Sequence, residues 1–299
     1  MLKQGIYEHI INKETERNIE YAEQLGLVCQ YQPIDAAESP QMLANYLANA
    51  IRKKLEDTEE QQDRVNIINR IMIDAGLIDD KQISQPTNLL SEVISKQKAA
   101  LSQESKTFTV RPISGFRVSN LFTGGNSSLS LGEEIRREIA SADEICLIVS
   151  FLRLSGVRII IDDLRKFCER EGSRLRIITT TYCGVTESKA IKELASLPNT
   201  EIKISYDTDR TRLHAKAYMF KRETGFTTAY IGSSNLSNAA LTSGLEWNLK
   251  ITEQDSFDTI KKFEATFESY WNDSEFVSYN GTEEDKRRLQ RYSTNRMDR

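Results

Sequence analysis

The chain has 299 residues, of which 39% are hydrophobic and 28% charged, and its formal net charge is −4. This length exceeds that of a typical single domain, so we expect two folded parts joined by a linker. No apolar run approaches the roughly 18 residues that a membrane-spanning helix needs, which disfavours a membrane protein. The N-terminus has no apolar block of the kind found in secretion signals, so a cytoplasmic location is expected.

Charge is distributed unevenly along the chain. Residues 107–252 carry 20 Lys and Arg against 16 Asp and Glu, whereas the remainder carries 20 against 28. A solvated surface explains this small basic excess about as well as a phosphate-binding groove does. The four cysteines have no CxxC spacing and the chain has two histidines, so buried thiols are expected rather than a zinc site.

The first part of the chain is predicted to be helical. Apolar residues from Met42 to Leu55 recur at helical spacing, and a second stripe runs from Val65 to Met72. Each stripe should bury one face against a neighbour, which predicts a small helical domain over residues 1–78. Residues 79–106 are rich in Gln, Ser and Lys and are predicted to form a linker or arm.

Short apolar strands alternate with helices after residue 107. The expected strands cover 144–151, 174–182 and 201–206, and the intervening helices cover 157–168 and 188–197. This order predicts parallel pairing with right-handed crossovers.

Further strands are expected at 214–220, 227–231 and 245–251, the first two as a hairpin, followed by a helix over 256–271. The predicted fold class is therefore α/β, a mixed sheet flanked by helices within residues 107–275, preceded by the small helical N-terminal domain. Residues 276–299 show no apolar stripe and are predicted to form a polar tail.

Two short motifs in the α/β part point to phosphate chemistry. His214 and Lys216 are two residues apart, so on a strand their side chains leave the same face. The run Gly232-Ser233-Ser234-Asn235 follows a predicted strand, where small residues let backbone N–H groups approach an anion. A phosphate group is the ligand that these residue types favour.

Together these residues resemble the signature of the phospholipase D superfamily. His214 and Lys216 match its HxK pair, the Gly232–Asn235 run matches its GSxN element, and Glu246 lies eleven residues further on. More narrowly, residues 121–271 resemble the single-HxK-motif, nuclease-like domain found N-terminal to superfamily 2 (DEAD/DEAH-type) helicases in bacteria. The resemblance rests also on the runs Thr179–Tyr182, Ser205–Thr208, Arg210–Lys216 and Gly244–Asn248.

The resemblance implies a metal-independent phosphodiesterase, a nuclease acting on DNA through a phosphohistidine intermediate. That mechanism needs two histidines, and His9 has no lysine two residues on, so His214 from both subunits of a homodimer would form one composite site. Glu246 would orient the imidazole, while Lys216, Ser233 and Asn235 would hold the phosphoryl oxygens. Neither a cofactor nor a metal is expected.

Several basic residues flank the His-Lys strand and are candidates for contact with nucleic acid: Arg210, Arg212, Lys221 and Arg222. A solvated, charged hairpin edge accounts for them equally well. Trp247 is expected in the core rather than at a binding surface.

One departure from the superfamily keeps a second interpretation open. Lys221 stands where the superfamily has an Asp five residues after the lysine. A catalytically degenerate module for nucleic-acid binding or dimerisation, belonging to a helicase or a restriction or phage-defence system, is therefore the alternative. The chain has no Gly-Lys-Ser/Thr phosphate-binding loop, so a partner helicase, fused or in trans, would lie outside this sequence. A membrane partner is not expected.

Overall fold

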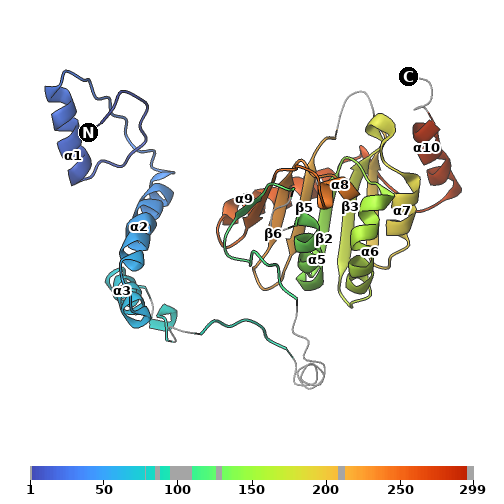
Figure 1. Cartoon of the computed structure of the whole chain (residues 1–299), viewed down its shortest axis with the longest axis horizontal. Helices are drawn as coiled ribbons and strands as arrows, with labels where there is room; N and C mark the ends of the chain where they lie inside the picture. Colours follow the sequence, from blue (N-terminus) through green and yellow to red (C-terminus); the bar gives the residue numbers. More distant parts are fainter. Residues whose placement is uncertain are drawn as a thin grey trace. The chain divides into compact units, whose positions relative to one another are not determined.

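The chain divides into two compact units (Figure 1). In the computed structural model, residues 1–99 belong to the first unit and residues 100–299 to the second. The structure describes residues 2–77, 79–84, 88–94, 110–125, 130–207 and 213–294. Each unit is considered by itself below.

The first unit is helical, as predicted, but its helices bury little. It contains α1 (Lys13–Gln24), α2 (Ser39–Glu56), α3 (Gln61–Asp74) and a short 3-10 turn, η1 (Asp79–Lys81). No residue of α2 is buried, and Leu43 and Leu47 are 49% and 52% exposed. The expectation of a packed bundle is therefore wrong, because within the described residues no neighbouring helix covers the apolar stripe of α2.

The second unit is built on one eight-stranded mixed sheet. Its strands are β1 (Asn120–Phe122), β2 (Glu144–Val149), β3 (Arg174–Thr180), β4 (Thr200–Ser205), β5 (Lys216–Lys221), β6 (Thr228–Gly232), β7 (Asn248–Thr252) and β8 (Phe276–Ser278). Their spatial order is β1-β7-β6-β5-β2-β3-β4-β8. The three strands joined by helical crossovers, β2, β3 and β4, are parallel, and all other neighbours are antiparallel. The predicted mixed α/β sheet is confirmed.

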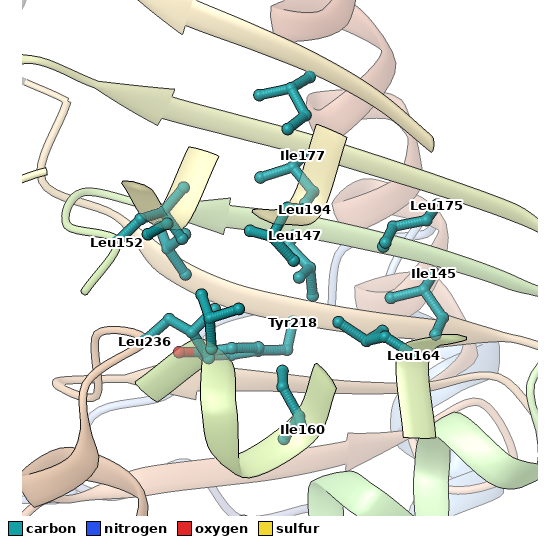
Figure 2. Packing of buried hydrophobic residues seen from close by; sticks show 14 of the residues in the cluster. Ile145, Leu147, Leu152, Ile160, Leu164, Leu175, Ile177, Leu194, Tyr218 and Leu236 are labelled. Atoms are coloured by element: carbon teal, nitrogen blue, oxygen red, sulfur yellow. The ribbon is translucent and has the colours of Figure 1, made fainter. Parts of the chain in front are cut away.

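Helices cover both faces of this sheet. On one face lie α5 (Leu131–Ser141), α6 (Leu154–Cys168) and α7 (Ser188–Ala195), and on the other lies α9 (Phe257–Trp271). Figure 2 shows the larger core, in which Tyr218 packs between Leu236 and Ile160. Burying each such aliphatic or aromatic side chain contributes roughly 1.5–3 kcal/mol. No helix within the described ranges is both long enough and apolar enough to cross a bilayer.

The C-terminal segment is folded rather than a polar tail. β8 pairs with β4, and α10 (Glu283–Thr294) contacts α7 and the 3-10 turn η2 (Tyr182–Gly184). Leu289 and Tyr279 are buried. The prediction failed because one buried leucine in an otherwise charged helix produces no apolar stripe in the sequence.

A buried charge network attaches α5 to strands β5, β6 and β7. The Lys250 Nζ lies 2.9 Å from a Glu138 carboxylate oxygen and 3.3 Å from one of Glu134, and all three side chains are fully buried. The Arg222 guanidinium and the Tyr230 hydroxyl also donate to Glu138. Burial acts to raise the pKa of Glu138, but the positive charges of Arg222 and Lys250 outweigh it and hold the pKa below its ordinary value.

Replacing Lys250 with Met should destabilise the protein, because it leaves the carboxylates of α5 with one fewer counter-charge in the interior. We expect the free energy of unfolding in urea to fall by about 3–5 kcal/mol. Lys261→Met, at an exposed ion pair, is the matched control and should change it by less than about 1 kcal/mol. The stabilisation from Glu138 should be present above its unfolded-state pKa of about 4.3 and be lost as the pH falls below it. Equal stability of the two variants would contradict this role.

Candidate active site

The predicted site residues meet at one edge of the sheet because of the strand register. Lys216, the first residue of β5, pairs with Val149, the last residue of β2. Gly232, the last residue of β6, pairs with Asn248, the first residue of β7. The segments that precede β5, follow β6 and precede β7 therefore leave the sheet side by side, and these segments carry the predicted motifs.

His214 and Lys216 are in direct contact at this edge. The Lys216 Nζ lies 2.9 Å from Nδ1 and 3.1 Å from Nε2 of His214, and it donates to the His214 carbonyl oxygen at 2.8 Å. An ammonium can only donate hydrogen bonds, so it can donate to whichever ring nitrogen lacks a proton. The Phe151 ring meets the imidazole edge-on, with the ring centroids 6.2 Å apart. His214 itself precedes β5, so the two side chains meet because the lysine folds back, not because both lie on a strand.

The two members of this pair differ in exposure. The imidazole of His214 is exposed, whereas Lys216 is buried. Burial lowers the pKa of Lys216 below its ordinary value of 10.5, and the negative charge of Glu246 opposes that shift. A charged group is thus held behind an accessible imidazole, where its field is screened little by water.

The Gly-Ser-Ser-Asn loop is fixed by buried hydrogen bonds around its central serine. The Tyr218 hydroxyl donates to the Ser234 carbonyl oxygen at 2.9 Å. The Asn248 amide donates to the Ser234 hydroxyl at 2.8 Å and accepts from the Ser234 N–H at 3.3 Å. Asn235 accepts the Phe151 N–H through Oδ1 at 3.0 Å. Because that N–H can only donate, the Asn235 NH2 group remains available to donate to an oxyanion.

Gly232 and Glu246 complete the site. A Cβ atom on Gly232 would lie 2.1 Å from the Trp247 carbonyl oxygen, so the close approach of β6 and β7 requires glycine there. The Glu246 carboxylate accepts a hydrogen bond from the Ser233 hydroxyl. The expected bond from Glu246 to the imidazole is not present among the contacts of the described residues. The same strand pairing explains this, because it brings Ser233 directly against the segment that carries Glu246.

The candidate basic residues do not gather at this site. Arg210 and Arg212 lie outside the described residues. Lys221 is at the opposite end of β5, about 17 Å along the strand from Lys216, where it pairs with Glu144 at 3.2 Å. Arg222 is buried and paired with Glu138. Neither Lys221 nor Arg222 therefore lies beside His214 and Lys216, and each has an acidic partner. Their contact with nucleic acid stays a prediction.

Sequence reasoning missed three residues that support the site. Phe151 follows β2 and contacts both His214 and Asn235, and Tyr218 and Asn248 hold Ser234. The alternation of side chains gave a usable signal for Tyr218, which is the next residue after Lys216 on the same face of β5. Trp247 was expected in the core but is 65% exposed. Among the residues that the structure covers, no three His, Cys, Asp or Glu side chains are grouped so that they could hold a metal ion.

A comparison with known protein families matches part of the second unit. Residues 135–271, slightly less than half of the chain, match the family described as cardiolipin synthase, PLD-like domain. This segment contains every described residue of the candidate site. This part of the second unit is therefore similar to phospholipase D-like domains. A search of curated proteins finds no match for the sequence.

Solved structures of similar fold include two bacterial proteins that align over almost their whole length. NucT from Helicobacter pylori is 20% identical, with 54% of this chain and 99% of NucT covered and a TM-score of 0.38. Nuc from Salmonella typhimurium, a phospholipase D family member, has the same identity and coverage and a TM-score of 0.41. Phosphatidylserine synthase from Haemophilus influenzae is 13% identical, with 60% of this chain and 46% of that protein covered and a TM-score of 0.38.

Replacing Asn248 with Ala should loosen the loop that carries Ser233 and Asn235, because the buried N–H and hydroxyl of Ser234 would lose their partner. We expect the free energy of unfolding to fall by about 1–3 kcal/mol. Asn280→Ala, at an exposed asparagine of the same unit, should change it by no more than about 0.5 kcal/mol. Denaturation of both variants by urea measures the difference, and an unchanged Asn248 variant would show that the loop is held by other contacts.

Proposed function

We propose that the chain is a metal-independent phosphodiesterase that cleaves DNA through a phosphohistidine intermediate at a composite dimeric site. The observation that carries the proposal is the contact between the buried Lys216 ammonium and the exposed His214 imidazole, at 2.9 and 3.1 Å. An imidazole that faces solvent and is backed by a cation suits attack on a tetrahedral phosphate, and the Asn235 amide of the adjoining segment can donate to a phosphoryl oxygen.

The reaction would proceed in two displacements. In the first, an imidazole nitrogen of His214 attacks phosphorus, and the P–O bond to the leaving strand breaks as the second histidine gives that oxygen a proton. In the second, water attacks phosphorus, the P–N bond breaks, and the second histidine takes the proton from the water. Lys216 and the Asn235 NH2 group would neutralise the non-bridging oxygens in both steps. Glu246 would fix the tautomer of the imidazole once Ser233 turns to the phosphate.

The need for a second histidine supports a dimer. His9 is the other histidine of the sequence and has no Lys-Asn support of the kind that surrounds His214. A two-fold axis places the same motif twice around one point, so two copies of His214 would supply both the nucleophile and the proton donor. We therefore place one composite site in each homodimer.

DNA is the proposed substrate on two grounds. The segment 107–252 that contains the site has a basic excess, and the motif runs resemble domains linked to superfamily 2 helicases. A helicase partner, fused or in trans, and a role in restriction or phage defence belong to the same proposal. The absent Asp does not remove a group from this site, because position 221 is at the far end of β5 and its lysine is paired with Glu144.

The decisive experiment is cleavage of DNA in excess EDTA by defined mixtures of wild-type and His214→Ala subunits. We expect the wild type to cleave and the variant alone to lose on the order of a thousand-fold or more in rate. If each site needs two histidines, equal mixing with full exchange of subunits should leave about a quarter of the wild-type activity, because only dimers with two wild-type subunits work. Activity of about half would mean that a single histidine is sufficient, and no loss in the pure variant would contradict the proposal.

The pH profile should report the ionisation of Lys216. Burial lowers the pKa of its ammonium, and activity needs the charged form, so cleavage should decline as the pH rises through a value below 10.5. Lys216→Arg keeps the charge at all accessible pH values. We expect its residual activity to persist on the alkaline side, and an unchanged alkaline limb would exclude Lys216 as the titrating group.

A non-catalytic DNA-binding or dimerisation module is the second candidate. The contact that favours it is the hydrogen bond from Ser233 to Glu246, which occupies the carboxylate expected to orient His214. Wild-type dimer that binds labelled DNA in a fluorescence anisotropy assay, yet never cleaves it in EDTA or with added Mg²⁺, would favour this reading.

A further inference from the structure

Large apolar side chains remain exposed at one corner of the sheet. Leu121 of β1, Leu249 of β7 and Ile231 of β6 are 47%, 43% and 47% exposed. Leu249 pairs directly with both Leu121 and Ile231, so the three side chains form one line across three strands. Trp247, 65% exposed, lies two residues before Leu249. These four residues are called the apolar row.

The apolar row continues a face that is covered elsewhere. Ala229 and Ile251 precede and follow the row on the same strands and the same face, and both are buried in the cluster that contains Ile260 of α9. Strand faces that meet water normally carry polar side chains. Here the uncovered positions carry leucine, isoleucine and tryptophan, which is the pattern of a surface that another molecule covers.

We propose that the apolar row is where a second copy of this chain docks, and that this contact assembles the composite site. The inference rests on the proposed function. The row adjoins the site directly, because Trp247 follows Glu246 and its backbone N–H and carbonyl both bond Ser233. If the two-fold axis runs along the strands, a partner seated on the row carries its own His214 edge next to this one.

The chemistry of the row suits a copy of itself. A two-fold interface brings the same patch together from both sides, so any charge near the axis would face a like charge. None of the four row residues is charged, whereas the ionic residue of β7, Lys250, points to the opposite face and is fully buried. An apolar centre with a polar rim is also the composition of stable homodimer interfaces.

The test compares two single variants of the full chain, one with a charge placed inside the apolar row and one with a charge placed outside it. Leu249→Lys would set two ammonium groups against each other, whereas Val277→Lys puts the same change on β8, an edge strand of the same sheet where Val277 is 36% exposed. Sedimentation velocity over a concentration series measures the dissociation constant. We expect Leu249→Lys to raise the dissociation constant on the order of a hundred-fold or more, and Val277→Lys to leave it unchanged.

Further measurements distinguish an effect on the interface from a loss of folding or of catalytic function. Circular dichroism should show both variants folded, and Leu249→Thr, which introduces a β-branched residue of the kind favoured in strands, should weaken the dimer without adding charge. A wild-type monomer at all concentrations, or a Leu249→Lys dimer of native affinity, would overturn the inference. A dimer that Leu249→Lys dissociates but that never cleaves DNA would uphold the interface and reject the proposed function. A Leu249→Lys protein that still dimerises and cleaves DNA would uphold the proposed function and reject the interface.

Discussion

The antiparallel register of β5, β6 and β7 is the constraint on which the candidate site depends. The motif residues lie in three segments separated by up to about thirty residues of sequence, and none of them is inside a helix that could carry it to the others. The pairings Lys216 with Val149 and Gly232 with Asn248 bring the three segments to one edge. A shift of one residue in either pairing would turn Lys216 or Asn248 to the other face.

Two sets of buried polar contacts hold that register. At the far end of the strands, the Glu138 carboxylate bonds Lys250 of β7, Tyr230 of β6 and Arg222, the residue after β5, and so ties this end of the sheet to one helix. At the near end, Asn248 and Tyr218 enclose the backbone and side chain of Ser234. The residues proposed to touch phosphate are thus held at the ends of rigid strands, which lowers the cost of orienting them in the reaction.

The sequence was sufficient for the fold class and for strands β2 to β7 with helices α6, α7 and α9, because apolar periodicity is a local signal. Motif spacing singled out His214, Lys216, Ser233, Asn235 and Glu246, whose segments the strand register brings to one edge. It was not sufficient for features that depend on contacts across the sheet. Arg222 looked like a free cation until its pairing with Glu138 across 84 positions was known, and α10 was missed because one leucine anchors it. Trp247 was assigned to the core because apolar character alone does not distinguish a core residue from an exposed apolar one.

The central claim is that His214 becomes covalently bonded to phosphorus. It is tested most directly by mixing the protein with DNA, quenching rapidly in alkali, in which a phosphoramidate survives, and measuring the mass of the digested peptides. We predict a nucleotide-bearing peptide that contains His214 and that disappears after treatment with acid. An adduct on another residue, or cleavage with no adduct at any quench time, would contradict the claim.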